Sequence, residues 1–390
     1  MTVRIAVLGA GPTGLEAALA AHQRGWDVTV YEAAPHVAGH VRAWGHVQLF
    51  TPWSMSASPR AVEALGLAPS PDECPTGHEL ADHCERVAAL LGDRVLTGTR
   101  VEAIARDGLL KHEEIGSDAR AARPFRLLVT GPDGEERVEL ADVVLDCTGT
   151  YSNPQPTGAG GIPAQGERRL DGRVVRRIPD VNAEPDRWAG RDVLLVGAGN
   201  SAQTVARDLA AAGARLVWAV RSPQPTWGAV EDDVLPSRAE LVASSRRLAA
   251  GTGGVELVTG VVVERLSEQD GRLHVTLEGR DGGRREVVVD EVVSMTGAVG
   301  DASLYRQLQV HECYATEGPI SLAATLLGSE GGDCLAQEAA GIDVLRNPEP
   351  RFFVLGMKSY GRNNTFLLRV GWEQVEEVFT ALDSELVVAA

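Results

Sequence analysis

A glycine-rich turn near the start of the chain limits the folds open to this sequence more than any other segment. Residues 9–14 read G-A-G-P-T-G and follow directly on the apolar stretch 3–8. An alanine-rich segment to about Arg24 comes next, and a second apolar stretch, 27–31, ends at Glu32. This order of strand, G-x-G-x-x-G turn, helix and strand predicts a βαβ unit.

Each glycine of this turn has a distinct task in a dinucleotide-binding unit. The first permits the tight turn, the second lets a pyrophosphate approach the backbone, and the third lets the helix pack on the strand. The helix N-terminus offers N–H groups and partial positive charge to the phosphates, and Glu32 is placed to accept hydrogen bonds from a ribose diol. We therefore expect a dinucleotide to be bound by Gly9, Gly11, Pro12, Thr13, Gly14 and Glu32.

The same pattern recurs in the middle of the chain. Residues 197–202 read G-A-G-N-S-A and lie between an apolar stretch, 192–196, and a helix to about Ala212 that leads to the strand 215–220. Arg221 stands where the first unit has its acid, and an arginine can pair with a 2′-phosphate, so NADP is favoured over NAD. The expected contacts of this second dinucleotide are Gly197, Gly199, Asn200, Ser201, Ala202 and Arg221.

Each of these units is accompanied by stretches that alternate apolar and polar residues between Gly/Asp turns. We expect antiparallel strands at 125–130, 137–140, 256–263, 273–278 and 286–293. Each half also has an apolar strand that ends in Thr-Gly, at residues 148–149 and 296–297. The Pro/Gly-rich stretch 153–166 is the expected linker.

Composition limits the class of protein and of partner. The 390 residues exceed what one hydrophobic core usually organises, so at least two domains are expected. The sequence has no apolar run long enough for a membrane span. A formal net charge of −17 argues against nucleic acid or an anionic bilayer as the partner. We expect a cytoplasmic protein that acts on a small molecule, with a homodimer as an open option for its assembly.

The two glycine-rich turns, each closed by a strand ending in Thr-Gly, resemble the two-dinucleotide-binding-domain flavoproteins of the pyridine nucleotide-disulfide oxidoreductase-like superfamily. Residues 147–156 (C-T-G-T-Y-S-N-P-Q-P) are similar to the A-T-G-x-x-x-x-P-x-x-P crossover of its flavin-containing monooxygenase-like branch. The resemblance implies an α/β fold with two Rossmann-like domains, each with the three-layer ββα architecture. It places an FAD-binding domain at 1–160 and 294–390, and an inserted NADPH-binding domain at 161–293.

The resemblance also implies flavin contacts outside the first turn. Residues 351–356 are similar to the strand that returns toward the flavin, but Met357 replaces the aspartate that many relatives carry there. Lys358 is one of only two lysines, and it precedes a helix expected from about Thr365, whose N-terminus would favour the negative charge of a reduced flavin. The flavin candidates are Gly39, Gln48, Thr51, Trp53, Thr148, Gly149, Gly356, Lys358 and Asn364; Gln48, Thr51, Lys358 and Asn364 are also the catalytic candidates.

Metal and thiol chemistry are not indicated. The five cysteines form neither a C-x-x-C nor a C-x4-C pair, and related flavoproteins use such pairs to reduce disulfides. His78 and His83 are five residues apart, which separates them too far around a helix to share a metal ion. We therefore expect no metal site.

The activity that the resemblance implies is that of an FAD- and NADPH-dependent flavin monooxygenase. Such an enzyme oxygenates a nitrogen or sulfur centre of a small molecule through a flavin C4a-hydroperoxide. The sequence departs from the branch because no asparagine lies between Glu32 and Gly149, and because only Gly172 survives of the Baeyer–Villiger signature. An NADPH-dependent flavin reductase or dehydrogenase without oxygen transfer, and a non-catalytic flavin- or nucleotide-binding sensor, stay open as alternatives.

Overall fold

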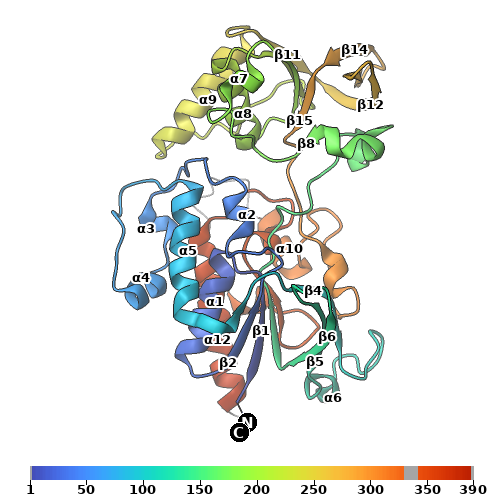
Figure 1. Ribbon diagram of the computed structural model, residues 1–390. Helices are drawn as coiled ribbons and strands as arrows, with labels where there is room; N and C mark the ends of the chain where they lie inside the picture. Colours follow the sequence, from blue (N-terminus) through green and yellow to red (C-terminus); the bar gives the residue numbers. More distant parts are fainter. Residues whose placement is uncertain (1, 329–340, 388–390) are drawn as a thin grey trace. The chain divides into compact units, whose positions relative to one another are not determined.

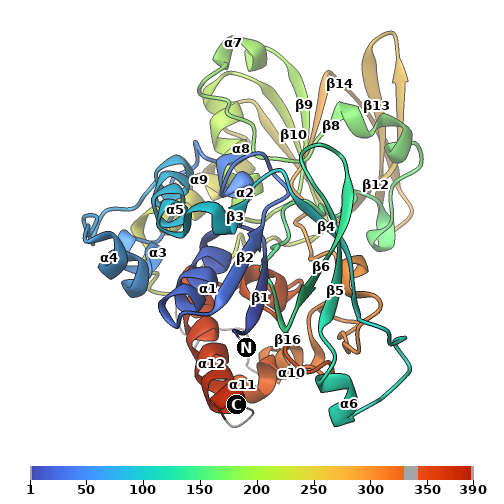
Figure 2. The same ribbon diagram turned by 60° about the horizontal axis from the view of Figure 1, so that its bottom comes forward.

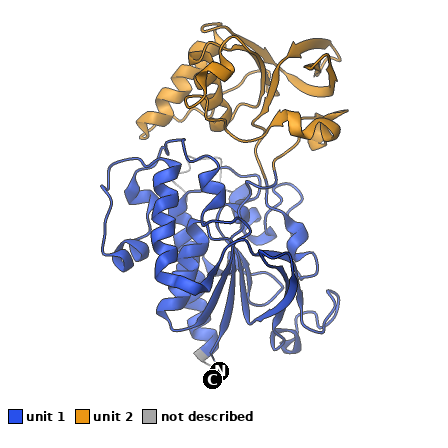
Figure 3. Ribbon diagram, in the orientation of Figure 1, with its two compact units in different colours: residues 1–153, 299–390 blue, residues 154–298 orange. Residues whose placement is uncertain are grey.

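The computed structural model describes residues 2–328 and 341–387, and the chain divides into two compact units (Figure 3). Unit 1 comprises Met1–Asn153 and Val299–Ala390, and unit 2 comprises Pro154–Ala298. Unit 2 is therefore inserted into unit 1. The boundaries between the units fall after residues 153 and 298. The boundaries expected from the sequence were residues 160 and 293. The cofactor bound by each unit stays a prediction.

Unit 1 is built on a parallel sheet with the strand order β16-β7-β1-β2-β3 (Figure 1). Its strands are β1 (Arg4–Leu8), β2 (Asp27–Tyr31), β3 (Val95–Leu96), β7 (Val143–Asp146) and β16 (Phe352–Val354). The central strands β1 and β7 are mostly apolar and almost wholly buried, because both faces of the sheet are covered. Their carboxyl ends meet at one edge, which brings the glycine-rich turn beside the segment after β7.

Alternate residues of β1 enter two separate cores. Ile5 and Val7 pack in one core with α1 (Pro12–Gln23), α5 (Gly77–Leu91) and α12 (Leu368–Val387). Ala6 and Leu8 pack in the other core with an antiparallel sheet, whose strands are β4 (Arg100–Arg106), β5 (Phe125–Thr130) and β6 (Glu136–Ala141). Figures 1 and 2 show the helices on one face of the parallel sheet and this antiparallel sheet on the other. The expected three layers are present in unit 1.

Unit 2 repeats these layers. Its parallel sheet has the order β11-β10-β9-β15-β8, and its antiparallel sheet has the order β12-β13-β14. Leu194 of β9 faces the antiparallel sheet, whereas Leu195 faces α8 and α9. The bounds are β8 (Val174–Val175), β9 (Asp192–Val196), α8 (Asn200–Ala211), β10 (Arg215–Val220), α9 (Pro236–Ala249), β11 (Val255–Thr259), β12 (Val261–Gln269), β13 (Arg272–Gly279), β14 (Arg284–Val289) and β15 (Glu291–Ser294).

Shorter helices complete the two units. Those of unit 1 are α2 (Gly39–Arg42), α3 (Trp53–Ser56), α4 (Pro59–Leu65), α6 (Asp118–Ala121), α10 (Ile320–Gly328) and α11 (Ile342–Leu345), and that of unit 2 is α7 (Pro185–Trp188). No helix in the described ranges has both the length and the apolar composition needed to span a membrane. The expected cytoplasmic location stays a prediction.

The structure corrects two of the expected strands. Residues 256–263 are divided between β11 and β12, because Gly260 adopts φ +70° and turns the chain. Residues 286–293 are divided between β14 and β15. Both β11 and β15 belong to the parallel sheet rather than to the antiparallel one. The helix expected from about Thr365 begins at Leu368.

A buried ionic cluster ties distant segments of unit 1 together. Glu349, which precedes β16, accepts hydrogen bonds from Arg106 of β4 at 2.6 Å and from Arg120 of α6 at 2.7 Å. All three side chains are at most 1% exposed. Burial alone would raise the pKa of Glu349, but hydrogen bonds from Arg120, the Gln309 backbone and Arg106 outweigh it, and the pKa is lowered.

We predict that Glu349→Gln lowers the free energy of unfolding by about 3–5 kcal/mol at neutral pH, because two buried guanidinium groups lose their counter-charge. The lowered pKa means that the stabilising charge is present above the pKa of an unfolded glutamate and is lost as pH falls through the folded value. The difference between the variant and the wild type should therefore shrink in acid. Urea denaturation at neutral and acidic pH measures both effects.

Glu139→Gln provides the control, since Glu139 pairs with Arg137 on the surface, with side chains about 40% exposed. It should change the free energy of unfolding by less than about 1 kcal/mol. Equal effects of the two substitutions would contradict a structural role for the buried cluster.

Candidate functional site

The glycine-rich turn of unit 1 lies wedged between the ends of two neighbouring strands. The Gly9 N–H donates to the Tyr31 carbonyl at 2.8 Å, and Gly9 adopts φ +94°. A Cβ on Gly9 would lie 2.8 Å from the Cys147 carbonyl oxygen, and one on Gly14 would overlap the Gly9 carbonyl oxygen. The first and third glycines are thus required by the packing of the protein itself.

The second glycine is not constrained in this way. A Cβ on Gly11 would meet nothing within 4 Å, so the space in front of its backbone is open. Gly11 is also the N-cap of α1, and no side chain hydrogen-bonds to this helix end. An open backbone at the N-terminus of a twelve-residue helix fits a pyrophosphate, which needs close approach, N–H donors and a favourable dipole.

Glu32 lies at the end of β2, beside the turn. One carboxylate oxygen accepts the Ala10 N–H at 2.8 Å, and the other accepts the Ala34 N–H, also at 2.8 Å. Each carboxylate oxygen has a second lone pair, so Glu32 can still accept a ribose hydroxyl while it holds the turn in place. Gly39 is close as well, because a Cβ there would lie 2.5 Å from the Ala34 side chain.

Lys358 lies inside unit 1 rather than on an open loop. Its ammonium donates to Asp146 at 2.6 Å, to the Asp301 carbonyl at 2.8 Å and to the Thr148 hydroxyl at 3.1 Å. The side chains of Lys358 and Asp146 are 2% and 0% exposed, and a Cβ on Gly300 would overlap the lysine stem. The ammonium is therefore bound by three oxygen atoms of the protein, and its role as a flavin contact stays a prediction.

The backbone at Gly356 is held by two side chains from elsewhere in the sequence. Gln374 of α12 accepts the Gly356 N–H at 2.9 Å, and the Ser359 hydroxyl donates to the Gly356 carbonyl at 2.7 Å. Gly356 adopts φ +71°, and a Cβ there would lie 2.9 Å from the Thr13 hydroxyl. Gly356 and Thr13, both expected at the flavin site, are thus neighbours, whereas Met357 brings no charge in place of the missing aspartate.

The remaining candidates of unit 1 make separate local contacts. Gln48 is exposed and donates to the Cys74 carbonyl at 3.1 Å, and the hydroxyls of Thr51 and Ser56 lie 3.0 Å apart. Asn364 is exposed, and Gly149 adopts φ +69° after Thr148. The structure brings Thr148 and Lys358 into contact but does not bond Gln48 or Thr51 to either of them.

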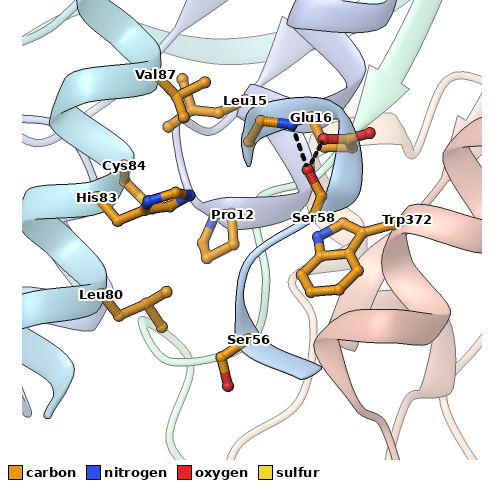
Figure 4. A pocket seen from close by; sticks show the side chains of 11 residues that line it. Pro12, Leu15, Glu16, Ser56, Ser58, Leu80, His83, Cys84, Val87 and Trp372 are labelled. Carbon is orange, nitrogen blue, oxygen red and sulfur yellow. Dashed lines mark hydrogen bonds between the residues drawn. The ribbon is translucent and has the colours of Figure 1, made fainter. Parts of the chain in front are cut away.

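A small cavity lies behind the turn, between α1, α5 and the start of α12 (Figure 4). Pro12, His83 and Trp372 line it, and its volume of about 20 Å³ is enough for one water molecule and too small for a substrate. Burial raises the pKa of the neighbouring Cys84 thiol to about 12. Figure 4 shows the α5 side chains on one side of this cavity and Ser58 and Trp372 on the other.

The turn of unit 2 is open at the equivalent position. Gly197 adopts φ +125°, and a Cβ on it would overlap the Met295 carbonyl oxygen at the end of β15. A Cβ on Gly199 would meet nothing within 4 Å. Gly199 is the N-cap of α8 without a side-chain cap, and Asn200 and Ser201 are exposed in the first turn of that helix.

Buried side chains that the sequence analysis did not identify brace this second turn. The Trp218 indole donates to the Gly197 carbonyl at 2.8 Å, and the Gln203 amide donates to the Ala198 carbonyl at 3.2 Å. Ser245 of α9 donates to Gln203 at 2.9 Å. Gln203 is only 1% exposed, and the sequence alone gives no signal of this network.

Arg221 follows β10 and has an exposed side chain, for which the described part of the chain provides no hydrogen-bond or ion-pair partner. Parallel strands end at one edge of a sheet, and the Gly197 N–H donates to the Ala219 carbonyl of β10 at 3.1 Å. Arg221 therefore follows two residues after Ala219, the β10 residue whose carbonyl accepts the hydrogen bond from the turn. A free guanidinium at this edge is suited to a phosphate monoester.

We predict that Gly11→Ala and Gly14→Ala have different consequences. Gly11→Ala should leave the melting temperature of the cofactor-free protein nearly unchanged, because its methyl group enters open space, but should abolish flavin binding by blocking the pyrophosphate. Gly14→Ala should destabilise the protein itself by overlap with the Gly9 carbonyl. Melting temperature and flavin absorbance of each purified variant test the pair, and a Gly11→Ala protein that retains flavin would contradict the assignment.

A second prediction concerns the buried pair of Lys358 and Asp146. Lys358→Met should lower the free energy of unfolding by about 3–5 kcal/mol, because it leaves a fully buried carboxylate without its partner. The double variant Asp146→Asn/Lys358→Met should recover part of this loss. Urea denaturation measures the free energy of unfolding of both variants. Lys111→Met, at the exposed second lysine, is the control, and its free energy of unfolding should be within about 0.5 kcal/mol of that of the wild type.

Comparison with known proteins finds that several relatives of this chain are oxidoreductases. A family model described as an NAD(P)-binding Rossmann-like domain matches residues 7–57. The indole-3-pyruvate monooxygenase YUCCA1 of rice (Oryza sativa subsp. japonica) is 30% identical over 219 residues, which are 55% of this chain and 47% of that protein. A ferredoxin–NADP reductase of Salinispora tropica is 29% identical over 51% of this chain and 49% of its own length. The chain thus spans about half the length of these curated relatives.

Solved structures share the fold over nearly the whole chain. The bacillithiol disulfide reductase of Bacillus cereus superposes with a TM-score of 0.71 and 20% identity, covering 98% of this chain and 99% of that one. The ornithine N-hydroxylase of Kutzneria sp. 744, solved with reduced FAD, NADP+ and L-ornithine, superposes with a TM-score of 0.66 and 16% identity, covering 99% of this chain and 100% of that one. The cofactors expected from the sequence, FAD and NADPH, match the FAD and NADP+ of the ornithine N-hydroxylase structure.

The predicted resemblance is thereby confirmed. Residues 7–57 match an NAD(P)-binding Rossmann-like domain, and the chain has the fold of the bacillithiol disulfide reductase and of the ornithine N-hydroxylase and resembles the two-dinucleotide-binding-domain flavoproteins.

Proposed function

We propose that this protein is an oxidoreductase that uses FAD on unit 1 and NADPH on unit 2. The observation that carries the proposal is the pair of glycine-rich turns, each with open space at its second glycine and an uncapped helix end. The two turns differ in the residue after the second strand, which is Glu32 in unit 1 and Arg221 in unit 2. A carboxylate favours a free ribose diol, and a guanidinium favours a 2′-phosphate.

The residues of each unit have defined tasks in this proposal. In unit 1, Gly11 admits the pyrophosphate to the backbone, and Glu32 accepts the ribose hydroxyls. In unit 2, Gly199 admits the second pyrophosphate, and Arg221 binds the 2′-phosphate. FAD, held by these residues of unit 1, would supply the redox chemistry between NADPH and an electron acceptor. The protein contributes binding, orientation and exclusion of water.

Within this class, we infer that the protein is a flavin monooxygenase acting on a nitrogen or sulfur centre of a small molecule. The match to a plant flavin monooxygenase at 30% identity supports this finer assignment, as does the crossover sequence 147–156. Oxygenation of a soft nucleophile needs positioning and a dry pocket more than an acid–base pair. The lack of an asparagine between Glu32 and Gly149 is the departure from the branch that favours an alternative.

The alternative is an NADPH-dependent flavin reductase that passes electrons to another acceptor without oxygen transfer. Ferredoxin–NADP reductases among the relatives favour this candidate. Disulfide reduction has less support, although disulfide reductases share the fold, because the sequence lacks a closely spaced cysteine pair. Burial also raises the pKa of Cys84 and of Cys147, which keeps both as unreactive thiols at neutral pH.

Turnover in isotopically labelled oxygen separates these functions. The purified protein should be yellow with flavin and should oxidise NADPH in the presence of thioanisole or N,N-dimethylaniline, used as sulfur and nitrogen probes. A labelled oxygen atom in the product supports the monooxygenase. NADPH oxidation that proceeds only with ferricyanide or a ferredoxin under anaerobic conditions would instead identify the reductase, and a protein without flavin would contradict both.

We predict that Arg221→Ala raises the KM for NADPH by about tenfold or more and leaves the KM for NADH within about twofold. The reason is that only NADPH carries the phosphate that the guanidinium would bind. Steady-state kinetics with each nucleotide measure the effect. Arg280→Ala, at an exposed arginine in the turn after β13, is the matched control and should alter neither constant. Parallel changes for both nucleotides would refute the phosphate contact.

A further inference from the structure

A second pocket lies on unit 1. None of its lining residues belongs to the two glycine-rich turns, and one of them, Trp53, is also a flavin candidate of the sequence analysis. The pocket has a volume of about 260 Å³, close to the lower end of the roughly 300–1,000 Å³ range of small-molecule sites. Its walls come from α3, the loop that follows α4, and one face of α5. The lining residues are Trp53, Leu65, Leu67, Ala68, Pro69, Glu79, Asp82, His83 and Arg86.

The walls of this pocket are held in place by hydrogen bonds and ring contacts. The Trp53 N–H donates to the Glu73 carbonyl at 2.8 Å, and the Ser54 N–H donates to the Pro71 carbonyl at 3.0 Å, so the loop after α4 is fastened to α3. The Trp53 and His83 rings lie 5.5 Å apart at an angle of 57°. The apolar part of the pocket therefore exists before any ligand binds, which reduces the entropy cost of binding.

The charged lining residues are not equivalent. Glu79 accepts the Thr76 N–H at 2.7 Å and its hydroxyl at 2.9 Å in the capping box of α5, which lowers the pKa of Glu79. Asp82 pairs with Arg42 at 3.3 Å. Both acids thus accept hydrogen bonds within the protein, Glu79 from neutral groups of Thr76 and Asp82 from Arg42, which also pairs with Glu85 at 2.7 Å.

Arg86 is the charged lining residue that forms no hydrogen bond or ion pair with the described residues. Its side chain is exposed. Positions 79, 82, 83 and 86 share one face of α5, so the guanidinium belongs to the same wall as His83. The pKa of His83 is lowered, first by burial and then by the positive charge of Arg86. His83 is therefore neutral at pH 7, and Arg86 supplies the uncommitted charge.

We propose that this pocket binds a small aromatic carboxylate, with the ring against Trp53 and Leu65 and the carboxylate on Arg86. An apolar wall with one free guanidinium matches such a ligand, because a planar carboxylate can accept two parallel hydrogen bonds from arginine. A cationic amine of the same skeleton could not make this pair of hydrogen bonds and would be repelled by the Arg86 guanidinium. The site is separate in chemistry from the two glycine-rich turns and does not depend on the proposed function.

Binding of 3-phenylpropionate and of 3-phenylpropylamine to the purified full chain tests this proposal, because the two probes differ only in their charged group. Isothermal titration calorimetry should show that the carboxylate binds and that the amine binds at least about tenfold more weakly. Arg86→Gln should raise the Kd of the carboxylate by about tenfold, and Trp53→Ala should raise it as well. Arg100→Gln, at an exposed arginine of β4 outside the pocket, should leave it within about twofold.

Melting temperatures of the variants establish that each is folded, and the exposed position of Arg86 makes Arg86→Gln the cleaner test. Tighter binding of the amine would assign the pocket to cations held on the face of Trp53 and would overturn the proposal. An unchanged Kd in Arg86→Gln, or no measurable binding of the carboxylate to the wild type, would overturn it equally.

Discussion

The close approach of a glycine to a carbonyl oxygen at the end of a neighbouring strand shapes both halves of this protein. Gly9 lies against Cys147 in unit 1, and Gly197 lies against Met295 in unit 2, each with a positive φ. A side chain at either position would push the turn away from the sheet edge. Because the turn cannot move outward, the next glycine is held in front of the sheet with its backbone open.

This geometry explains how one architecture can hold two different dinucleotides. The open backbone and the helix end are common to both units and suit any pyrophosphate. Discrimination then depends on the residue after the second strand, where Glu32 is bonded to the turn and Arg221 has no partner among the residues that the structure describes. A bonded carboxylate presents lone pairs to hydroxyl groups, whereas a free guanidinium presents charge to a phosphate.

The sequence was informative where structure depends on neighbours along the chain and uninformative where it depends on distant segments. The strands at 27–31, 125–130, 192–196 and 215–220 have the expected bounds, because apolar runs between turn residues determine them locally. Lys358 was predicted as a flavin contact, whereas its bond to Asp146, more than two hundred residues earlier, was not predicted because the sequence does not show contacts between distant segments. Gln374 and Gln203 were missed for the same reason, since Gln374 bonds to Gly356, and Gln203 bonds to Trp227 and Ser245.

The central claim is that each unit offers one dinucleotide site and that the two sites prefer different ligands. Calorimetric titration of the flavin-free protein, first with FAD and then with NADP+, tests this most directly. The account predicts one equivalent of FAD and one further equivalent of NADP+ per chain, with the second unaffected by saturation with the first. A single shared equivalent, in which either nucleotide displaces the other, would contradict it.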